Sequence, residues 1–568
     1  MEANKAQDRA IGEAKRASWR RFTEEASRDS SKLWRLEKWA RTRSGLPPEP
    51  AQLPELQGDH PGDPVAATFE EKTQALAARF FPSQKADCTG IQDQQFHDDS
   101  FQASFQMDDP INEHEVKQAI QRAGSWSAPG LDGIPAGLLK ACGSHLVQVL
   151  QPLIQASFDL EYFPKRFRTA VVAVVPKPNK TPAQRKKVGG WRPISLLNTV
   201  GKVFESIIGR RIASAAEQHN LFPDEQMGNR AQRSTMLAVK LVLESVRTAW
   251  SRKAVTSLLQ LDLKGAYDSV DHLHLLNNLR HIGFPPKVVR WVHSFLSDRS
   301  AQLQFDGRKS SFIQLVVGVP QGSPLSPVLF LLYIASLYTR LKEKHGILVV
   351  GFSDDTNILS VGRDTAATVR QLEGAWKECE DWAKENGMAF QPEKSELMHF
   401  TKGRAADVTP LRLGPAVITP VSSARFLGIW LNRKLNWKPQ LKKLEQKLER
   451  QCRALTGIAA STWGCSLTRA REIYTKVIRS AIAYGAPAYH VPTEPGGNPQ
   501  GCARNLAKHQ SACLRTVLGA YKATPIRQLE TEAAVPPLDL YLNYRLANFE
   551  RRLKASGKAE VIRRWRIS

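Results

Sequence analysis

The sequence predicts a protein of several domains in which helices are mixed with β-strands, an α+β fold. At 568 residues the chain is too long for one compact core, and 42% hydrophobic residues are enough to bury several. From residue 111 onward, helical patterns alternate with short β-branched runs such as TAVVAVVP at 169–176. After about residue 433 the strand signals fade, and basic segments with a helical pattern follow.

The N-terminal part reads differently. Residues 3–44 are charged and lack turn clusters, which predicts a basic helix, and the GLPPEP segment at 45–50 ends it. A linker rich in Pro, Gly and Asp follows to about residue 65. The segment TFEEKTQALAARFFP at 68–82 predicts a short helix with an acidic first turn. Residues 85–110 are polar and typical of a loop.

The charge indicates a polyanionic partner. Lys and Arg total 80 against 55 acidic residues, a net charge of +25. An excess of this size favours nucleic acid over a membrane surface. Simple solubility is the alternative, but small domains reach it with far less charge.

The cysteines and the apolar runs exclude other classes. The seven cysteines are scattered and contain no C-x-x-C pair, which argues against a disulfide framework and a zinc finger and favours a reducing, intracellular compartment. The N-terminus lacks the apolar stretch of a secretory signal. The longest apolar run, at 327–335, is about half of what a membrane-spanning helix needs, so we expect a soluble protein without a membrane partner.

Three carboxylates stand at predicted strand ends. Asp354 and Asp355 separate two apolar runs in VVGFSDDTNILSV at 349–361, and Asp262 follows the run LLQL. If these strands pair, the carboxylates converge, and such a cluster is destabilising unless cations neutralise it. Magnesium, which takes hard oxygen ligands, fits that role. The alternative is that the adjacent aspartates are ordinary turn residues.

The loop GVPQGSPLSPVLFLLYI at 318–334 adds a Gly- and Pro-containing turn before an apolar helix. With this loop, the three central motifs resemble the palm of a reverse transcriptase: Asp262 to Tyr267, Pro320-Gln321-Gly322, and Phe352-Ser353-Asp354-Asp355. Further segments resemble motifs of non-LTR (LINE-like) retrotransposon polymerases, of a fungal Tad, I or Jockey type: 125–140, 191–208, 226–235, 389–400 and 425–437. The resemblance covers residues 110 to 545.

The resemblance implies a right-hand polymerase fold with fingers, an antiparallel-sheet palm flanked by helices, and a helical thumb. It divides the chain into five parts: a basic helical extension and linker at 1–65, an N-terminal fingers extension at 66–157, fingers and palm at 158–432, a thumb at 433–545 and a basic tail at 546–568.

The resemblance also implies roles at the reacting centre. Asp262 and Asp354 would bind two Mg²⁺ ions, with Mn²⁺ as an alternative, and Asp355 would complete the metal-binding acidic set. Tyr267 would act as a steric gate against a ribose 2′-hydroxyl, where a plain packing aromatic is the alternative. Gln321 and Gly322 would contact the incoming nucleotide and the template.

Three cations complete this set. Arg192 resembles the arginine that clamps the incoming triphosphate, because a guanidinium suits phosphate oxygens. Lys177 would assist it, or else is a solvated surface lysine. Lys394 matches a lysine that serves as general acid to pyrophosphate, and a structural ion pair is the competing interpretation. The hairpin FLGIWL at 426–431 resembles a primer grip.

Two departures from the family and one absence stand out. Ser353 replaces a frequent alanine, and Asn229 stands where the family usually has an aromatic residue. The N-terminal 110 residues are too short and too poor in acidic and histidine motifs for the endonuclease of such elements, which predicts a polymerase module. His272 and His274 lack ligand-spaced companions and are expected to be structural.

The predicted function is that of an RNA-directed DNA polymerase, an enzyme that extends a primer 3′-hydroxyl with deoxynucleotides. Its partners would be an RNA template, a DNA primer and deoxynucleoside triphosphates, and the resemblance implies a nuclear location. A catalytically inactive or domesticated nucleic-acid-binding remnant is the alternative. A maturase-like scaffold is a third hypothesis, which the intact acids disfavour.

Overall fold

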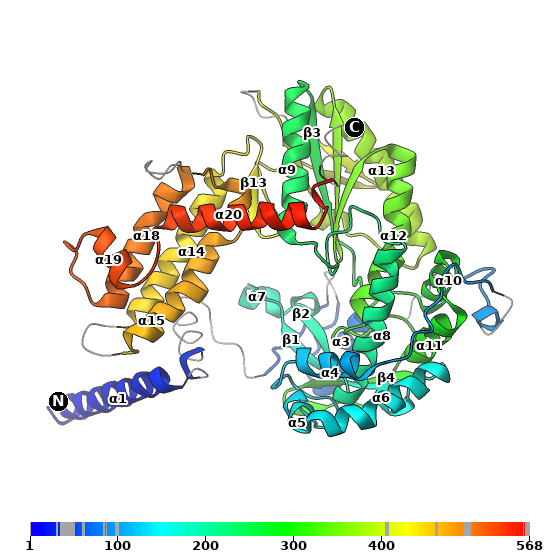
Figure 1. Ribbon diagram of the computed structural model, residues 1–568, viewed down its shortest axis with the longest axis horizontal. Helices are drawn as coiled ribbons and strands as arrows, with labels where there is room; N and C mark the ends of the chain where they lie inside the picture. The colour runs from blue at the N-terminus through cyan, green and yellow to red at the C-terminus, as the bar shows by residue number, and fades with distance from the viewer. Residues whose placement is uncertain are drawn as a thin grey trace.

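The computed structural model describes residues 2–29, 32–34, 52–58, 63–82, 86, 88–96, 101–178, 180–403, 408–459, 464–492, 501–560 and 562. The polypeptide is organised around one four-stranded antiparallel sheet at the upper right of Figure 1, with a second, five-stranded sheet below it and a group of helices beside them. The mixture of helices and strands that the sequence predicts is confirmed.

The four-stranded sheet has the order β7-β8-β3-β9. Its strands are β3 (Val255–Leu261), β7 (Leu348–Phe352), β8 (Asp355–Gly362) and β9 (Glu396–Phe400). Both faces are buried, as expected for strands rich in Leu, Ile and Val. Side chains alternate between two cores: Leu259 and Ile358 lie in one, Leu258 and Leu359 in the other.

Helices cover both faces of this sheet. α12 (Ser326–His345) and α13 (Thr365–Glu385) pack on one face, and α9 (Thr235–Ser251) packs on the other. The hairpin of β12 (Ser423–Phe426) and β13 (Ile429–Asn432) joins the core on the α9 side. It coincides with the predicted FLGIWL hairpin, whose turn is formed by Leu427 and Gly428.

The five-stranded sheet mixes antiparallel and parallel pairing. Its strands are β1 (Thr169–Pro176), β2 (Trp191–Leu196), β4 (Arg299–Phe305), β5 (Arg308–Lys309) and β6 (Ile313–Leu315). β1 pairs antiparallel with β2 and parallel with β4. A small separate hairpin consists of β10 (Leu411–Leu413) and β11 (Ala416–Ile418).

Helices surround this lower part of the molecule (Figure 1). They are α4 (Glu113–Arg122), α5 (Ala136–Ala141), α6 (Gly143–Asp159), α7 (Pro182–Arg185), α8 (Thr199–Gln218), α10 (His272–Ile282) and α11 (Pro286–Leu296).

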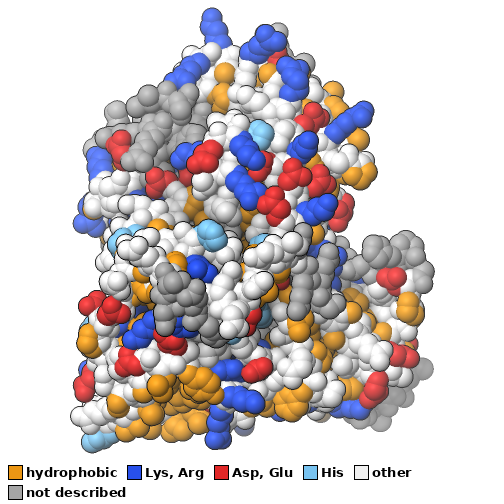
Figure 2. All heavy atoms as spheres, turned by 90° about the vertical axis from the view of Figure 1, so that its right-hand side faces the viewer, with side chains coloured by type: hydrophobic (Ala, Val, Ile, Leu, Met, Phe, Trp, Pro, Cys, Tyr) orange, Lys and Arg blue, Asp and Glu red, His pale blue; other side chains and the backbone are white. Residues whose placement is uncertain are grey.

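Figure 2 shows hydrophobic side chains gathered along the lower edge and mixed acidic and basic side chains above them. The basic excess is therefore not concentrated in one patch on this face.

The predicted N-terminal helices are found where they can be followed. α1 (Glu2–Arg28) forms the first part of the expected basic helix, whereas the GLPPEP segment lies outside the described residues. α3 (Phe69–Phe80) confirms the second helix. A capping box begins it: the Thr68 hydroxyl accepts a hydrogen bond from the Glu71 amide, and the Glu71 carboxylate accepts one from the Thr68 amide.

The C-terminal part is helical, as predicted. Its helices are α14 (Lys438–Thr456), α15 (Leu467–Ile473), α16 (Arg479–Ala483), α17 (Ala486–Tyr489), α18 (Gly501–Leu518), α19 (Ile526–Glu532) and α20 (Leu538–Ala555), with a π-helical turn at Tyr474–Ile478. α20, red in Figure 1, runs from this helical group across to α9. All seven cysteines are free thiols, in agreement with the expected lack of disulfides.

Candidate active site

The paired aspartates occupy the turn between β7 and β8. Phe352 pairs with Asp355, so Ser353 and Asp354 form a two-residue turn. Ser353 adopts the left-handed conformation with φ 57°, which tight hairpin turns require. The hairpin predicted from VVGFSDDTNILSV is confirmed, and its turn presents both carboxylates at one end of the sheet.

Asp262 arrives at the same place from β3. β3 pairs antiparallel with β8, and the last pair in register is Leu261 with Thr356. Extending this register by one pair places Asp262, which follows Leu261, opposite Asp355, which precedes Thr356. The structure brings the three predicted carboxylates together.

The surrounding protein raises the pKa of both turn carboxylates, Asp354 and Asp355. Burial raises the pKa of Asp354 above its ordinary value, and the negative charge of Asp262 adds to the rise. Burial, followed by the charges of Asp354 and Asp262, raises the pKa of Asp355 to about 6. Such mutual repulsion is what a bound cation relieves.

Two of the carboxylates, Asp262 and Asp354, line a cavity of about 590 Å³, and cationic side chains line it as well. Seven of the predicted site residues line it: Asp262, Asp354, Lys394, Arg192, Lys177, Tyr267 and Gln321. Two others, Asp355 and Gly322, lie next to lining residues in the chain and not on the wall itself.

Arg192 and Lys177 come from β2 and from the end of β1. Burial lowers the pKa of Lys177, and the neighbouring charges of Lys394 and Arg79 lower it further. Lys177 is half-buried and lines the cavity, which favours the interpretation that it assists Arg192 over that of a solvated surface lysine. A set of cations that repel one another suits an anionic ligand.

Arg79 is a cavity residue that the sequence analysis did not identify. It lies in the last turn of α3, which also brings Phe80 to the wall. The segment was recognised only as a helix, and nothing in its pattern relates it to a site more than 180 residues further along the chain. Packing of α3 against the five-stranded sheet brings it there.

Lys394 lies within ion-pair distance of Asp262. Its Nζ is 3.3 Å from Asp262 Oδ2, and Lys394 follows Gln391, whose amide donates a hydrogen bond to the Asp262 carbonyl. The structure thus contains the ion pair that was one of the two interpretations of Lys394. Because Lys394 also lines the cavity, its side chain can contact a bound ligand as well as Asp262.

Tyr267 is a half-buried wall of the cavity. Its ring stacks on Phe330 of α12 with 5.0 Å between ring centroids. Burial raises its pKa to about 12, with a contribution from the charge of Asp354, so the hydroxyl stays protonated. The ring both packs in the core and faces the cavity, so the two sequence interpretations of Tyr267 are compatible.

Gln321 is held by an acid that the sequence analysis passed over. Its Nε2 donates hydrogen bonds of 2.8 Å to both carboxylate oxygens of Asp268, the residue after Tyr267. The Gln321 carbonyl accepts a hydrogen bond from the Ser195 amide of β2. Gly322 has φ 141°, and a Cβ there would lie 2.4 Å from the Ser195 carbonyl oxygen, so only glycine fits.

Asp268 should make folding stability pH-dependent. Burial raises its pKa to about 7, against 3.8 as its ordinary value, so the folded state holds a proton that the unfolded state releases between these values. Stability from this group is therefore present at low pH and lost as pH rises toward 7. In thermal unfolding, we therefore compare the Tm of Asp268→Asn with that of the wild type at pH 5 and at pH 8. The difference, variant minus wild type, should be larger at pH 8 by about 2 °C or more, because only the wild type loses this contribution. Parallel pH profiles of the two proteins would contradict this assignment.

The two departures from the family pattern contact each other. Asn229 Nδ2 donates a 2.8 Å hydrogen bond to Ser353 Oγ, and the Met227 amide donates to the Gly351 carbonyl at 2.8 Å. A Cβ at Gly228 would lie 2.2 Å from the Ser353 nitrogen, so the loop at 226–233 presses against the catalytic turn. A polar pair thus stands where the family usually has an aromatic residue.

The donor set fits a hard divalent cation, the class of ion that reverse transcriptases generally use. Carboxylate oxygens are the ligands that Mg²⁺ prefers, and Mg²⁺ sites often combine one or two carboxylates with water and substrate phosphates. Within the described ranges, no group of three or more His, Cys, Asp or Glu residues is arranged to hold a metal ion by itself.

The remaining predictions concern structural residues. His272 begins α10, and its Nε2 lies 2.8 Å from the Gly318 carbonyl oxygen, in agreement with a structural role. No helix in the described part of the chain combines the length and the apolar character needed to cross a bilayer.

Comparisons with known proteins agree with this geometry. Residues 175–431 match the family described as reverse transcriptase (RNA-dependent DNA polymerase). The chain is 26% identical over 547 residues to the RNA-directed DNA polymerase from mobile element jockey of Drosophila melanogaster, covering 93% of this chain and 57% of the relative. It is 27% identical over 417 residues to the probable RNA-directed DNA polymerase from transposon X-element of the same species, covering 72% and 45%.

A solved structure, apo telomerase from Candida tropicalis, aligns with a TM-score of 0.35 at 14% identity over 71% of this chain and 69% of that chain, too weak a likeness to support a conclusion. The chain spans about half the length of the curated relatives it matches. The assignment to a fungal Tad, I or Jockey type stays a prediction. The family match at residues 175–431 and the retrotransposon relatives together support a relationship of this chain to LINE-like, non-LTR reverse transcriptases.

Proposed function

We propose that this chain is an RNA-directed DNA polymerase that extends a primer 3′-hydroxyl with deoxynucleotides on an RNA template. One observation carries the proposal: a single cavity is lined both by the carboxylates of Asp262 and Asp354 and by the cations Arg192, Lys177 and Arg79. Carboxylates suit a metal and an attacking hydroxyl, and cations suit a triphosphate.

The chain's side chains divide the work. Asp262 and Asp354 would hold the divalent ions, and Asp355 would add negative charge beside them. Bound Mg²⁺ supplies activation of the attacking hydroxyl and stabilisation of charge on the departing pyrophosphate. Arg192 and Lys177 would orient the triphosphate.

The remaining lining residues select the nucleotide and release the product. The Tyr267 ring, which lines the cavity, would exclude a 2′-hydroxyl. Asp268 fixes the Gln321 amide, which would contact the nucleotide, and Gly322 lets the loop approach the Ser195 carbonyl of β2 closely. Lys394, paired with Asp262, would give a proton to the departing pyrophosphate.

We further propose the division into fingers, palm and thumb. The four-stranded sheet with α9, α12 and α13 would be the palm, the five-stranded sheet with its helices the fingers, and the helices from α14 onward the thumb. The excess of basic residues in the chain provides charge for the phosphates of template and primer.

Primer extension tests the activity directly. The purified full chain should incorporate dTMP on a poly(rA) template with an oligo(dT) primer when Mg²⁺ is present, and EDTA should stop it. The absence of incorporation with both Mg²⁺ and Mn²⁺ would reject the polymerase and favour a nucleic-acid-binding remnant.

Metal binding has a readout that does not depend on activity. Mg²⁺ should stabilise the wild-type fold, by about 1.4 kcal/mol at ten times its Kd, because it binds only the folded carboxylates. The Asp262→Asn/Asp354→Asn double variant should lose this rise in thermal unfolding. Asp381→Asn, at an exposed position on α13, is the matched control and should keep it. An equal Mg²⁺ effect in all three proteins would place the ion elsewhere.

A further inference from the structure

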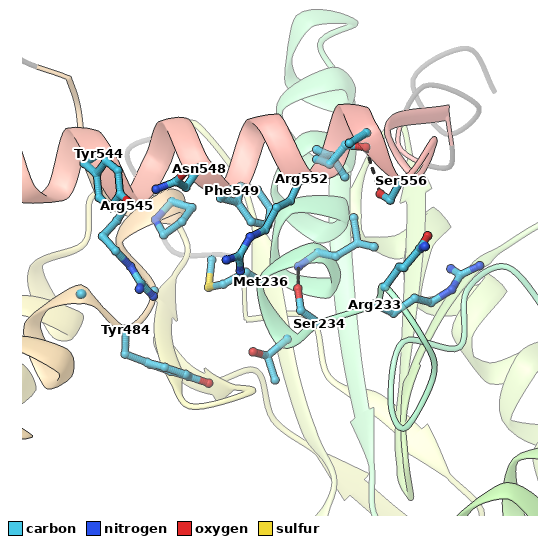
Figure 3. A pocket seen from close by; sticks show the side chains of 18 residues that line it. Arg233, Ser234, Met236, Tyr484, Tyr544, Arg545, Asn548, Phe549, Arg552 and Ser556 are labelled. Carbon is cyan, nitrogen blue, oxygen red and sulfur yellow. Dashed lines mark hydrogen bonds between the residues drawn. The ribbon is translucent and has the colours of Figure 1, made fainter. Parts of the chain in front are cut away.

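A second cavity, of about 720 Å³, lies apart from the carboxylate cavity. Three segments enclose it: α20, the turn at 483–487 between α16 and α17, and the residues that begin α9. Figure 3 shows α20 crossing over the space, with Ser234 and Met236 on the α9 side and Tyr484 on the opposite side. Its lining residues include none of those assigned above to the reaction.

Its wall carries unneutralised positive charge. Arg545 and Arg552 of α20 line it, both are exposed, and in the part of the chain that the structure describes neither has an acidic partner. No Asp or Glu is among the described lining residues. A third lining arginine, Arg233, is already paired, with 3.1 Å between its Nη2 and Asp224 Oδ1. The cavity therefore has two guanidinium groups available for an anion.

Aromatic rings alternate with these charges. Arg545, Phe549 and Arg552 follow one another at helical spacings of four and three, so they share a face of α20. Tyr544 beside them is 64% exposed. Across the cavity, the ring of Tyr484 is 43% exposed and anchored, because its hydroxyl donates a 2.7 Å hydrogen bond to the Leu427 carbonyl.

This chemistry matches single-stranded nucleic acid. Guanidinium groups suit backbone phosphates, and exposed aromatic rings stack on bases regardless of sequence. A cavity of this size has room for a unit of one or two nucleotides but not for a duplex. An acidic peptide would use the arginines but would leave the exposed rings without a matching partner.

The cavity also adjoins the catalytic turn. The loop at 226–234 supplies Arg233 and Ser234 to its wall and, through Met227 and Asn229, holds the turn that carries Asp354. A strand bound here would therefore lie beside the proposed palm. We propose that this cavity binds a single-stranded segment of nucleic acid through Arg545 and Arg552, with bases against Tyr544 and Phe549. The inference rests on the proposed polymerase function and assigns that enzyme a strand-holding site outside its reaction cavity.

Binding of labelled oligonucleotides to the full chain tests the proposal. Fluorescence anisotropy would compare single-stranded RNA and single-stranded DNA of one sequence over a range of salt concentrations. The Arg545→Ala/Arg552→Ala double variant should lower the salt slope of log K by about 1.4, because each phosphate contact on a single strand contributes about 0.7. Tyr544→Ala should weaken binding about tenfold without changing that slope.

The matched control is Arg504→Ala/Lys554→Ala, which removes two exposed charges outside the cavity from α18 and α20. It should leave affinity and slope near wild type, and circular dichroism should confirm that each variant is folded. Equal losses in the two double variants would overturn the proposal, as would polyglutamate that competes as well as an oligonucleotide of equal charge. Tighter binding of RNA than of DNA would assign the cavity to the template strand. Equal binding of RNA and DNA would mean that the cavity can hold either strand. Both outcomes support the proposal.

The same variants separate this proposal from the polymerase itself. With saturating template and primer, the Arg545→Ala/Arg552→Ala protein should still extend the primer, because neither arginine lines the carboxylate cavity. If the wild-type chain extends primers but the Arg545→Ala/Arg552→Ala protein binds oligonucleotides equally well, the strand-holding site alone is overturned. A chain that binds through them but never extends a primer overturns the polymerase alone.

Discussion

Asp354→Asn is expected to lower nucleotide incorporation at least about 10³-fold while leaving the protein folded, because a metal-held carboxylate centre supplies several kcal/mol to the reaction. The amide occupies the same space at the turn between β7 and β8 and keeps the backbone pairing of Phe352 with Asp355. It removes a negative charge that Asp262 and burial already disfavour. Steady-state primer extension on an RNA template measures the loss.

Stability should move in the opposite direction. Because the folded state raises the pKa of Asp354, replacing the carboxylate with a neutral amide should leave the Tm unchanged or higher at pH 8 without metal. Asp381→Asn removes an exposed carboxylate from α13 and should change neither activity nor Tm. If Asp354→Asn retained more than about a tenth of wild-type activity, the metal role of this residue would be wrong.

Tyr267→Ala is expected to relax discrimination against ribonucleotides by about 10²-fold. Its ring, stacked on Phe330, forms a wall of the reaction cavity, and its removal opens the space that a 2′-hydroxyl needs. The measurement is the ratio of kcat/KM for dTTP and UTP on the same template and primer. A change in this ratio, and not merely in rate, distinguishes a gate from a packing residue.

Tyr267→Phe is the matched control because it keeps the ring and its stacking partner and removes only the hydroxyl. It should preserve discrimination within about threefold, since the proposed exclusion is steric. The alanine variant also leaves a void beside Phe330, which costs about 3 kcal/mol or more of stability, so its fold must be checked by thermal unfolding. Unchanged discrimination in a folded Tyr267→Ala protein would leave the tyrosine with its packing role only.

Local patterns in the sequence predict much of the site. The hairpin around Asp354 follows from two apolar runs broken by a polar turn, and the position of Asp262 follows from the strand before it. Their meeting depends only on whether β3 and β8 pair, which the register confirms. The separate helical character after residue 433 is likewise visible in composition alone.

Other parts depend on packing that no local pattern encodes. Arg79 reaches the cavity because α3 packs on the five-stranded sheet, and the parallel pairing of β1 with β4 joins segments more than 120 residues apart. Asp268 directly follows Tyr267 in the sequence, yet its geometry with Gln321 needs the loop at 318–323 folded against it. The arginines of α20 gain a shared cavity only because that helix crosses to α9.

The hydrogen bond between Asn229 and Ser353 bears on how such enzymes can be recombined. Residue 229 belongs to one motif and residue 353 to another, yet the two side chains form a single contact behind the catalytic turn. A chimera that imports either motif alone from a relative would juxtapose an aromatic ring with a serine, or an asparagine with an alanine. These two motifs should therefore be exchanged together, as one inherited unit.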